Sequence, residues 1–290
     1  MDETVLIGVI GGSGLYHMAE LQDAERRTID TPFGAPSGAV VVGTLRGKRV
    51  AFLPRHGEGH VYPPARIPQR ANIYALKSLG VRFIIGVNAC GSLREDYAPG
   101  HIVVPDQLFD YNIGRRDRSF FEDDLVAHVS VADPYDAALR TVLVQAARDV
   151  GATVHDGGTF IIEDGPRFAT RAESRIFKSW GCDIIGMTTA PEAFLAREAE
   201  IAYATMAHIT DYDAWRDHEE GVTVEMVIQT FRENVQRAEQ ALARAVELLD
   251  PTQTTPSHAA LEGAIMTSRD KLSAATLERL RPIVARALRL

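Results

Sequence analysis

The chain has 290 residues, with 31 Lys and Arg against 39 Asp and Glu, so its formal net charge is −8. This acidic balance argues against a general polyanion binder, which carries a basic face, and we expect no nucleic-acid partner. Two cysteines, Cys90 and Cys182, are too few for a disulfide framework, and we expect two reduced, buried thiols. No run approaches the ~18 apolar residues of a membrane span, and no signal-peptide pattern opens the chain. We therefore expect a cytoplasmic protein without membrane partners.

Short apolar runs alternate with longer segments in which apolar residues recur every three or four positions. The first pattern predicts buried strands and the second predicts amphipathic helices. In chain order, the predicted elements are strands 5–10, 39–45 and 49–54, helix 67–79, strands 83–87 and 102–105, helix 137–150, strands 159–162 and 183–187, helix 191–199, strand 201–209 and helix 224–249. This alternation predicts a single α/β domain over residues 1–250. Residues 251–290 predict a helical extension in which Pro282 interrupts helix 274–288.

The first predicted strand ends in a glycine-rich segment, residues 11–14. Its glycines let backbone N–H groups approach a ligand closely, and Ser13 adds a hydroxyl, so the segment suits an anion. A tight strand-to-helix turn explains the same residues. The dinucleotide-binding fingerprint fails because His17 stands where Gly or Ala is needed.

Arg55 and His56 follow the predicted strand 49–54. The pair suits phosphate, because a guanidinium offers paired donors to two oxygens; a surface ion pair of Arg55 is the alternative. His56 and His60 are four residues apart, but the two glycines between them disfavour the helix that a metal-binding pair of this spacing needs. We therefore expect no metal site here.

Two further strand ends have residues that permit a ligand. Segment 88–92 consists mostly of small residues, which allow close backbone approach at the edge where α/β sheets bind ligands, or which form a packing turn. Segment 184–192 predicts a strand that runs into a helix, with Thr189 as a possible N-cap and Pro191 in the first turn. A helix start with free hydroxyls receives anions, although a well-capped helix explains the pattern too.

Asp211 and Asp213 follow the predicted strand 201–209 and give the most informative signal. If the chain stays extended, both carboxylates point to one face. Carboxylates that close repel each other, so one pKa rises and that group can hold a proton. A protonated carboxyl can donate to a basic nitrogen while its neighbour accepts from an amine. A solvated acidic turn or a helix cap is the alternative.

Six sequence motifs occur in one order along residues 5 to 240: IGVIGGSGLY, PRHGEGH, NACGSL, EDGPRFATRAES, IIGMTTAPEAFLARE and TDYDAWRDHEE. Together they resemble the trimeric purine nucleoside phosphorylase family, in its branch that acts on S-methyl-5′-thioadenosine. The resemblance implies a twisted mixed sheet flanked by helices. It also implies phosphorolysis of this thionucleoside to adenine and 5-methylthioribose 1-phosphate, a reaction of purine and methionine salvage. A purine nucleoside phosphorylase acting on methylthioinosine or on inosine and guanosine is the alternative, and a hydrolase of the same substrate is a further one.

The resemblance also assigns site residues. The implied phosphate ligands are Ser13, Arg55, His56, Thr188 and the backbone of Ala89. The implied nucleoside contacts are Met187 for the ribose, Phe168, Asp211 and Asp213 for the purine, Val222 and Val227 for the methylthio group, and His128 from a neighbouring subunit. The extension 251–290 is implied to pack on the active site or on the subunit interface.

Asp211 is the expected proton donor to purine N7, and Asp213 is expected to orient it or to accept from the exocyclic amine. The resemblance implies a homotrimer or a hexamer of two trimers, with phosphate as a co-substrate and no cofactor. The sequence departs from the family pattern near the base: Asp164 replaces a usual Glu, and Glu163 stands where an apolar residue is common. Gln69 replaces a frequent aromatic residue, so it receives no ribose role.

Overall fold

The computed structural model describes residues 4–12, 18, 20–112, 116–216 and 223–290, with the side chains of residues 225–235 left aside. Its strands are β1 (Ile7–Gly11), β2 (Gln22–Arg27), β3 (Val40–Leu45), β4 (Lys48–Pro54), β5 (Phe83–Ser92), β6 (Ile102–Val104), β7 (Gln107–Asp110), β8 (Val154–Asp156), β9 (Thr159–Ile162), β10 (Ile184–Gly186) and β11 (Ala202–Asp211). Its α-helices are α1 (Gln69–Ser78), α2 (Ala137–Asp149), α3 (Arg171–Ser179), α4 (Thr189–Glu198), α5 (Val224–Leu248), α6 (Ala274–Arg279) and α7 (Arg281–Leu288).

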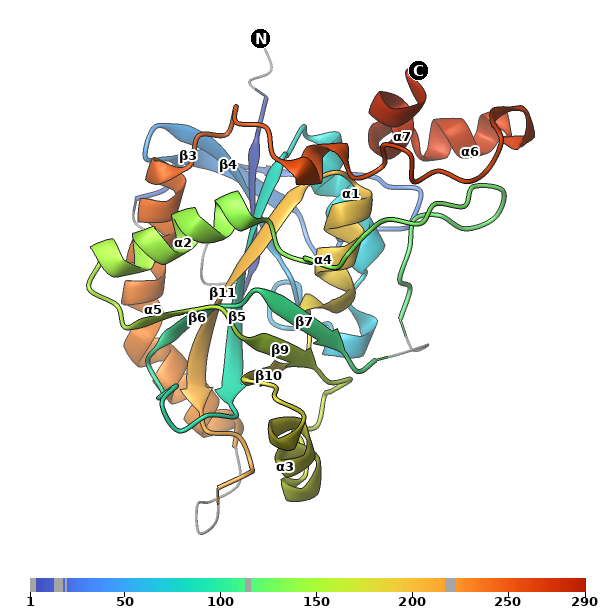
Figure 1. Ribbon diagram of the computed structural model, residues 1–290. Coiled ribbons are helices and arrows are strands. Elements are labelled where there is room, and N and C mark those ends of the chain that lie inside the picture. Colours follow the sequence, from blue (N-terminus) through green and yellow to red (C-terminus); the bar gives the residue numbers. More distant parts are fainter. Residues whose placement is uncertain (1–3, 13–17, 19, 113–115, 217–222) are drawn as a thin grey trace.

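The described strands form one mixed sheet around the long central strand β5 (Figure 1). The strand order is β2-β3-β4-β1-β5-β10-β9-β7, and β11 pairs with β5 and also with β6, which pairs with β8. Strands β4, β1, β5 and β11 run parallel, whereas β10 runs antiparallel to β5 and β3 antiparallel to β4. The expected twisted mixed sheet is confirmed.

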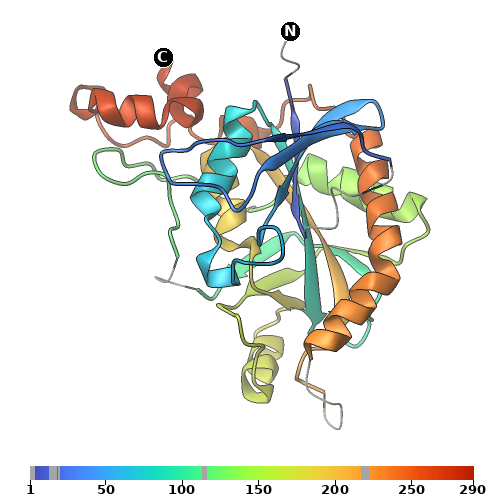
Figure 2. The same cartoon turned by 180° about the vertical axis from the view of Figure 1, so that it is seen from behind.

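Helices cover both faces of this sheet, and each face buries its own apolar core. Helices α2 and α5 pack on one face through aliphatic side chains such as Leu143 and Leu242, which are 0% exposed. Helices α1, α4 and α7 pack on the other face through side chains such as Ile73, Leu195 and Val284, also 0% exposed. Figure 2 shows α1 and α5 on opposite sides of the sheet. This layering is the single α/β domain that the alternating pattern predicts.

Most predicted elements are present with shifts of one to three residues at their ends. The hairpin of β3 and β4 forms around residues 46–47, and α1 ends before Gly80, whose φ of +94° is the left-handed conformation that favours glycine. Strand β5 is longer than predicted, since segment 88–92 continues it along β11 instead of forming a turn.

Four elements have no counterpart among the predictions, namely β2, β7, β8 and α3. Strand β2 is polar and almost fully exposed, so it lacks the apolar alternation that identifies a strand, and its pairing with β3 at the sheet edge creates it. Strands β7 and β8 have four and three residues, too few for a periodic signal.

The C-terminal extension packs on the α1 side of the sheet, as Figures 1 and 2 show. The Tyr74 hydroxyl of α1 donates to the carbonyl of Arg279 (3.0 Å), and Glu200 accepts two bonds from Arg286. The predicted interruption of helix 274–288 is confirmed: α6 and α7 meet at Leu280, and Pro282 lies in the first turn of α7. Whether the extension also serves an active site or a subunit interface stays a prediction.

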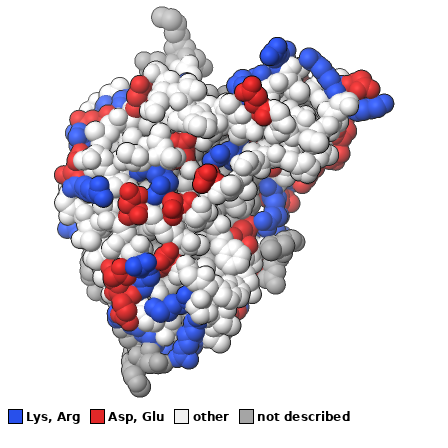
Figure 3. Space-filling model, viewed as in Figure 1, with Lys and Arg blue, Asp and Glu red and all other residues white. Residues whose placement is uncertain are grey.

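Acidic and basic side chains are interspersed over the face in Figure 3, and no broad field of one sign covers it. Cys90 and Cys182 are both free and buried, as expected, and burial raises the pKa of each thiol. Within the described residues, we find no helix that combines the length and apolar character needed to cross a membrane.

Candidate active site

The candidate site lies where the edge of β5 has no strand partner. On this edge, β1 pairs with residues 83–86 and β10 pairs with residues 91 and 92, so residues 87–90 pair with none of the described strands there. Residues two apart in a strand direct their backbone groups to the same edge, so the N–H of Ala89 points to the side on which the Val87 carbonyl is bound. Ala89 is also exposed within this otherwise buried strand. The gap therefore offers the backbone donor that the resemblance implies.

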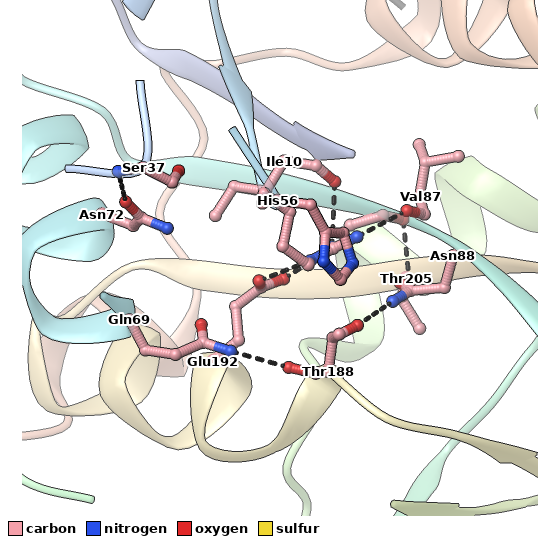
Figure 4. A network of polar contacts seen from close by, with 12 residues as sticks. Ile10, Ser37, His56, Gln69, Asn72, Val87, Asn88, Thr188, Glu192 and Thr205 are labelled. Atoms are coloured by element: carbon pink, nitrogen blue, oxygen red, sulfur yellow. Dashed lines mark hydrogen bonds and ion pairs between the residues drawn. The ribbon is translucent and has the colours of Figure 1, made fainter. Parts of the chain in front are cut away.

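Arg55 lies beside this gap, buried to 2% exposure. Its Nε and NH2 groups donate to the two carboxylate oxygens of Glu192, each at 2.8 Å. Its remaining bonds run from NH1 to the carbonyl of Val87 (2.8 Å) and from NH2 to the carbonyl of Ile10 (3.0 Å; Figure 4). The paired donors that we expect to face two phosphate oxygens are bonded to Glu192 here, and the phosphate role of Arg55 stays a prediction. The alternative of a surface ion pair is wrong, since both side chains are buried.

His56 follows Arg55, and its ring points into the same region (Figure 4). Nδ1 lies 2.9 Å from the carbonyl of Tyr62; a carbonyl only accepts, so Nδ1 carries the proton and donates. Burial lowers the pKa of His56 to about 4, so the imidazole is neutral at pH 7 with its lone pair on Nε2. Such a ring accepts a hydrogen bond from a protonated phosphate oxygen.

Thr188 presents a hydroxyl to the gap with its proton available. Its Oγ1 accepts from Nδ2 of Asn88 (3.0 Å), which fixes the oxygen and leaves the hydroxyl proton free for another acceptor. Thr205 donates to Oδ1 of Asn88 (2.6 Å), which sets the orientation of the amide, and Gln69 donates to the Thr188 carbonyl (3.0 Å; Figure 4). Thr188, rather than the predicted Thr189, precedes the first residue of α4, and its side chain makes no capping bond. Ala190 is not helical (φ −108°, ψ 133°), so the regular part of the helix begins at Pro191, as predicted.

Asp211 and Asp213 converge over Gly91 of β5. A Cβ placed on Gly91 would lie 3.0 Å from Oδ1 of Asp211 and 3.1 Å from Cβ of Asp213, so a glycine is required for this approach. The chain does not stay extended as assumed, because Asp213 has a φ of +51°, yet the two carboxyls still share one site. The alternative of a solvated acidic turn is wrong, since each residue is 7% exposed.

The two carboxyls differ in their partners. Asp211 accepts from the Thr210 hydroxyl (2.7 Å) and from the backbone N–H of Asp213 (2.8 Å). Oδ2 of Asp213 is buried without a hydrogen-bond partner among the described residues. Burial raises the pKa of both groups, and the charge of Asp213 adds to the shift of Asp211. Each carboxyl is therefore easier to protonate than a carboxyl in water.

The candidate donor at Ala89 and the carboxyl pair at Gly91 lie close together along β5. The two residues are two positions apart, which corresponds to about 7 Å in an extended strand. The N–H of Ala89 points to the open edge of the strand, whereas the carboxyls lie over Gly91. The strand thus sets the distance between the two candidate subsites.

The predicted contacts of the sugar and of the base, Met187 and Phe168, belong to two segments that pack together. A Cβ on Gly165 would lie 2.6 Å from Sδ of Met187, so Met187 packs directly against the loop that carries Phe168. Both side chains are half-buried. Glu163 directly follows β9 and is 7% exposed. Its pKa is raised to about 8 by burial and by the charge of Asp213. An uncharged third carboxyl therefore lies near the base side.

Three of the predicted residues cannot be placed. Ser13 and Val222 lie outside the described residues, and the side chain of Val227 is not described. His128 is exposed and borders a groove of about 360 Å³ with Phe194 and Glu198, near the C-terminal end of α4. Thr188 precedes the opposite end of that helix. Within one chain, His128 is therefore not brought to the site.

Three residues near the candidate site are not predicted from the sequence. Glu192 and Asn88 belong to the motifs IIGMTTAPEAFLARE and NACGSL, but their side-chain partners come from other elements and leave no local signal. The third is Arg116, whose NH1 donates to the carbonyls of Met187 and Ala190 and whose NH2 donates to that of Asp164, each at 2.8 Å. Its side chain is 4% exposed. Among the described residues, no group of three or more His, Cys, Asp or Glu is placed to hold a metal ion.

A mixed α/β sheet that brings an open strand edge beside two buried carboxyls of raised pKa is typical of an enzyme for a small molecule. Residues 6–247 match the model of the phosphorylase superfamily, and the chain belongs to this family.

Relatives and solved structures of this family cover nearly the whole chain. The S-methyl-5′-thioadenosine phosphorylase of Chloroflexus aurantiacus is 53% identical over 280 residues, 97% of each chain. That of Hyperthermus butylicus is 52% identical over 246 residues, 84% of this chain and 89% of the relative. A methylthioadenosine phosphorylase from an antarctic soil metagenomic library superposes with a TM-score of 0.92 at 44% identity, over 97% of this chain and 99% of that one. The methylthioadenosine phosphorylase of Schistosoma mansoni in complex with adenine gives a TM-score of 0.84 at 39% identity, over 92% and 100%.

Proposed function

We propose that this chain catalyses the phosphorolysis of S-methyl-5′-thioadenosine, giving adenine and 5-methylthioribose 1-phosphate. The observation that supports the proposal is the unpaired edge of β5 at residues 87–90 beside the two buried carboxyls over Gly91. The names of the relatives in Chloroflexus and Hyperthermus support the same reaction.

In this reaction, the C1′–N9 bond breaks with its electron pair moving to the purine, and a phosphate oxygen forms the new bond to C1′. Positive charge develops on the sugar and is stabilised by the bound phosphate, which sits among fixed donors at the gap. Asp211 gives its proton to N7, so the base leaves neutral, and Asp213 accepts from the exocyclic amine. Backbone N–H groups, the Thr188 hydroxyl and the His56 ring hold the phosphate.

The carboxyl pair favours a 6-aminopurine over a 6-oxopurine. An adenine presents N–H donors to Asp213, whereas a 6-oxopurine presents an acceptor there. Sites built on such a bond discriminate by ~10⁴–10⁵-fold, while a methylthio pocket distinguishes tails by only ~1–3 kcal/mol. Turnover of methylthioadenosine, methylthioinosine and adenosine with phosphate tests this order. Faster turnover of methylthioinosine than of methylthioadenosine would favour the 6-oxopurine enzyme instead.

We further propose that the active form is a homotrimer or a pair of trimers in which His128 of one subunit completes the site of the next. The exposed position of His128, away from the site of its own chain, supports this arrangement. Sedimentation of the purified protein should give three or six chains. A monomer with full activity would contradict it.

A further inference from the structure

Thr205 of β11 carries a fully buried hydroxyl that bonds toward the candidate site. Its residue is 0% exposed, and its Oγ1 lies 2.6 Å from Oδ1 of Asn88 and 2.9 Å from the carbonyl oxygen of Gly86. Thr205 pairs in register with Gly86, and a Cβ on that glycine would lie 3.0 Å from the Thr205 oxygen. The glycine thus leaves room for this hydroxyl beside β5.

The hydroxyl begins a chain of hydrogen bonds that ends at Thr188. Asn88 is 6% exposed, accepts the Thr205 bond on Oδ1 and donates from Nδ2 to Oγ1 of Thr188 at 3.0 Å. The three side chains come from β11, from β5 and from the residue before α4, and Figure 4 shows them together. The chain therefore connects the interior of the sheet to the hydroxyl that faces the gap of β5.

Two arrangements of protons satisfy these groups, and they differ in the orientation of the Asn88 amide. In one, Thr205 donates to Oδ1 and Nδ2 donates to Thr188, so the Thr188 proton is available to a ligand. In the other the amide is reversed: Thr205 accepts from Nδ2 and donates to Gly86, and Thr188 donates its proton to Oδ1. Hydrogen bonds between two oxygens are shorter than those from an amide nitrogen, so the distances of 2.6 Å and 3.0 Å favour the first arrangement.

The orientation of this amide decides what Thr188 offers to an anion. An anion accepts hydrogen bonds, so it is held by a hydroxyl that donates and is repelled by one that presents only lone pairs. Because Thr205 is 0% exposed, it does not reach a ligand at the gap itself. Its effect on a ligand passes through Asn88.

We propose that Thr205 is a positioning residue for phosphate: through the Asn88 amide it holds the Thr188 hydroxyl as a hydrogen-bond donor to the anion. The inference rests on the proposed phosphorolysis and assigns how one donor of its phosphate subsite is oriented. This role is additional to those of the phosphate ligands that the resemblance implies.

The test measures the KM for phosphate in Thr205→Val and in two control variants. Thr205→Val keeps the shape of the side chain but removes the donor, so the amide reverses and takes the Thr188 proton. We expect the phosphate KM to rise about tenfold or more, as for the loss of one hydrogen bond to a charged group. Adenine affinity, measured without phosphate, should change by less than about twofold.

The controls separate the hydroxyl from its surroundings. Thr205→Ser keeps the donor, so its phosphate KM should stay within about twofold of the wild type. Ser257→Ala also removes a buried hydroxyl donor (2% exposed), but one that bonds to Asp136 at 2.7 Å, before α2. It should likewise leave the phosphate KM within about twofold. A rise in Thr205→Ser as large as that in Thr205→Val would contradict the role of the hydroxyl.

A second comparison shows whether the effect passes through Thr188. In a Thr188→Val background the hydroxyl that Thr205 positions is absent, so adding Thr205→Val should change the phosphate KM by less than about twofold. An equal rise in both backgrounds would overturn the inference, and so would a Thr205→Val enzyme with the phosphate KM of the wild type. A parallel weakening of adenine and phosphate binding would show that Thr205 only stabilises the fold.

Thr205→Cys replaces Thr205→Val if the latter does not fold, because a thiol is a much weaker donor than a hydroxyl. A selective rise in its phosphate KM is expected, and an unchanged KM would refute the inference. Phosphate-dependent adenine release by the wild type tests the proposed function separately, since that result does not depend on Thr205.

Discussion

Asp211 and Asp213 are two carboxyls whose affinity for a proton is raised by burial. Both are almost fully buried, and burial raises the pKa of each. Asp211 accepts two internal hydrogen bonds, which hold its carboxyl in place. Oδ2 of Asp213 has no hydrogen-bond partner among the described residues. This geometry supports the proposal that the Asp211 carboxyl is fixed in place while Asp213 accepts a hydrogen bond from the base.

Asp211→Asn should lower kcat/KM for the adenine nucleoside by at least about 100-fold, because an amide cannot deliver a proton to N7. Steady-state kinetics on methylthioadenosine with saturating phosphate measure it. The folded state of the variant is checked by its thermal transition. An unchanged kcat/KM would remove Asp211 from the proton-donor role.

Glu163 gives a prediction about pH and stability. Burial, with the charge of Asp213, raises the pKa of Glu163 in the folded chain to about 8, above the usual value near 4.5. The folded state therefore binds more protons than the unfolded state between these values, and stability is lost as the pH rises through this window. Glu163→Gln removes that loss. Its free energy of unfolding should exceed that of the wild type by about 1–3 kcal/mol more at pH 8 than at pH 5.

Urea denaturation of the wild type and Glu163→Gln at both pH values measures this difference, in which the titration of groups that are not coupled to Glu163 cancels. Glu262→Gln, at an exposed position, controls for the loss of one carboxylate. A difference between Glu163→Gln and wild type that is the same at pH 5 and pH 8 would show that Glu163 does not titrate as described.

At this scale, the sequence predicts residue types better than partners. Segment 88–92 is predicted to permit a ligand or to form a packing turn, the Arg55–His56 pair is predicted to suit phosphate, and the two lie at one gap. The commitment of Arg55 to Glu192 could not be predicted, because the two residues are 137 positions apart and only the fold brings them together. The same holds for Asn88, whose amide is oriented by Thr205 on another strand.

Helix α3 begins with a signal that is readable in the sequence. Thr170 accepts from the N–H of Glu173, and the Glu173 carboxylate accepts from the N–H of Thr170, which is a capping box. The pattern Thr-x-x-Glu within the motif EDGPRFATRAES is its sequence form, although no helix is predicted over these residues. Strand β2 differs, because no local pattern announces it and only pairing with β3 forms it.

Thr170→Ala should destabilise the protein by about 1 kcal/mol, because the Ala side chain cannot accept from the N–H of Glu173. Thr141→Ala is the matched control: its hydroxyl donates to the carbonyl of Ala137 inside the exposed face of α2, where no cap is lost. The control should change stability by less than about 0.5 kcal/mol. Equal losses in chemical denaturation of the two variants would show that the capping box contributes nothing.

For the molecule as a whole, the alternation of strands and helices predicts the α/β architecture because each helix must bury an apolar stripe on the sheet. The branched sheet is beyond such a prediction. Strand β5 pairs with β1 and β10 on one edge and with β11 on the other, and the register of these pairs creates the gap. The candidate site thus depends on the register in which β5 pairs with its neighbours, and composition and periodicity do not determine that register.

The net charge of −8 argues against a general polyanion partner and is compatible with the single phosphate subsite that we propose. Arg55, the buried cation beside the gap of β5, is paired with Glu192. The proposed subsite thus needs no basic surface around it.

The central claim is that phosphate, and not water, attacks the sugar. The direct measurement is the release of adenine from methylthioadenosine by the purified enzyme, with and without inorganic phosphate, together with the identity of the sugar product. The account predicts release that depends on phosphate and yields 5-methylthioribose 1-phosphate in equal amount to adenine. Adenine released at the same rate without phosphate, with free 5-methylthioribose as the product, would contradict it.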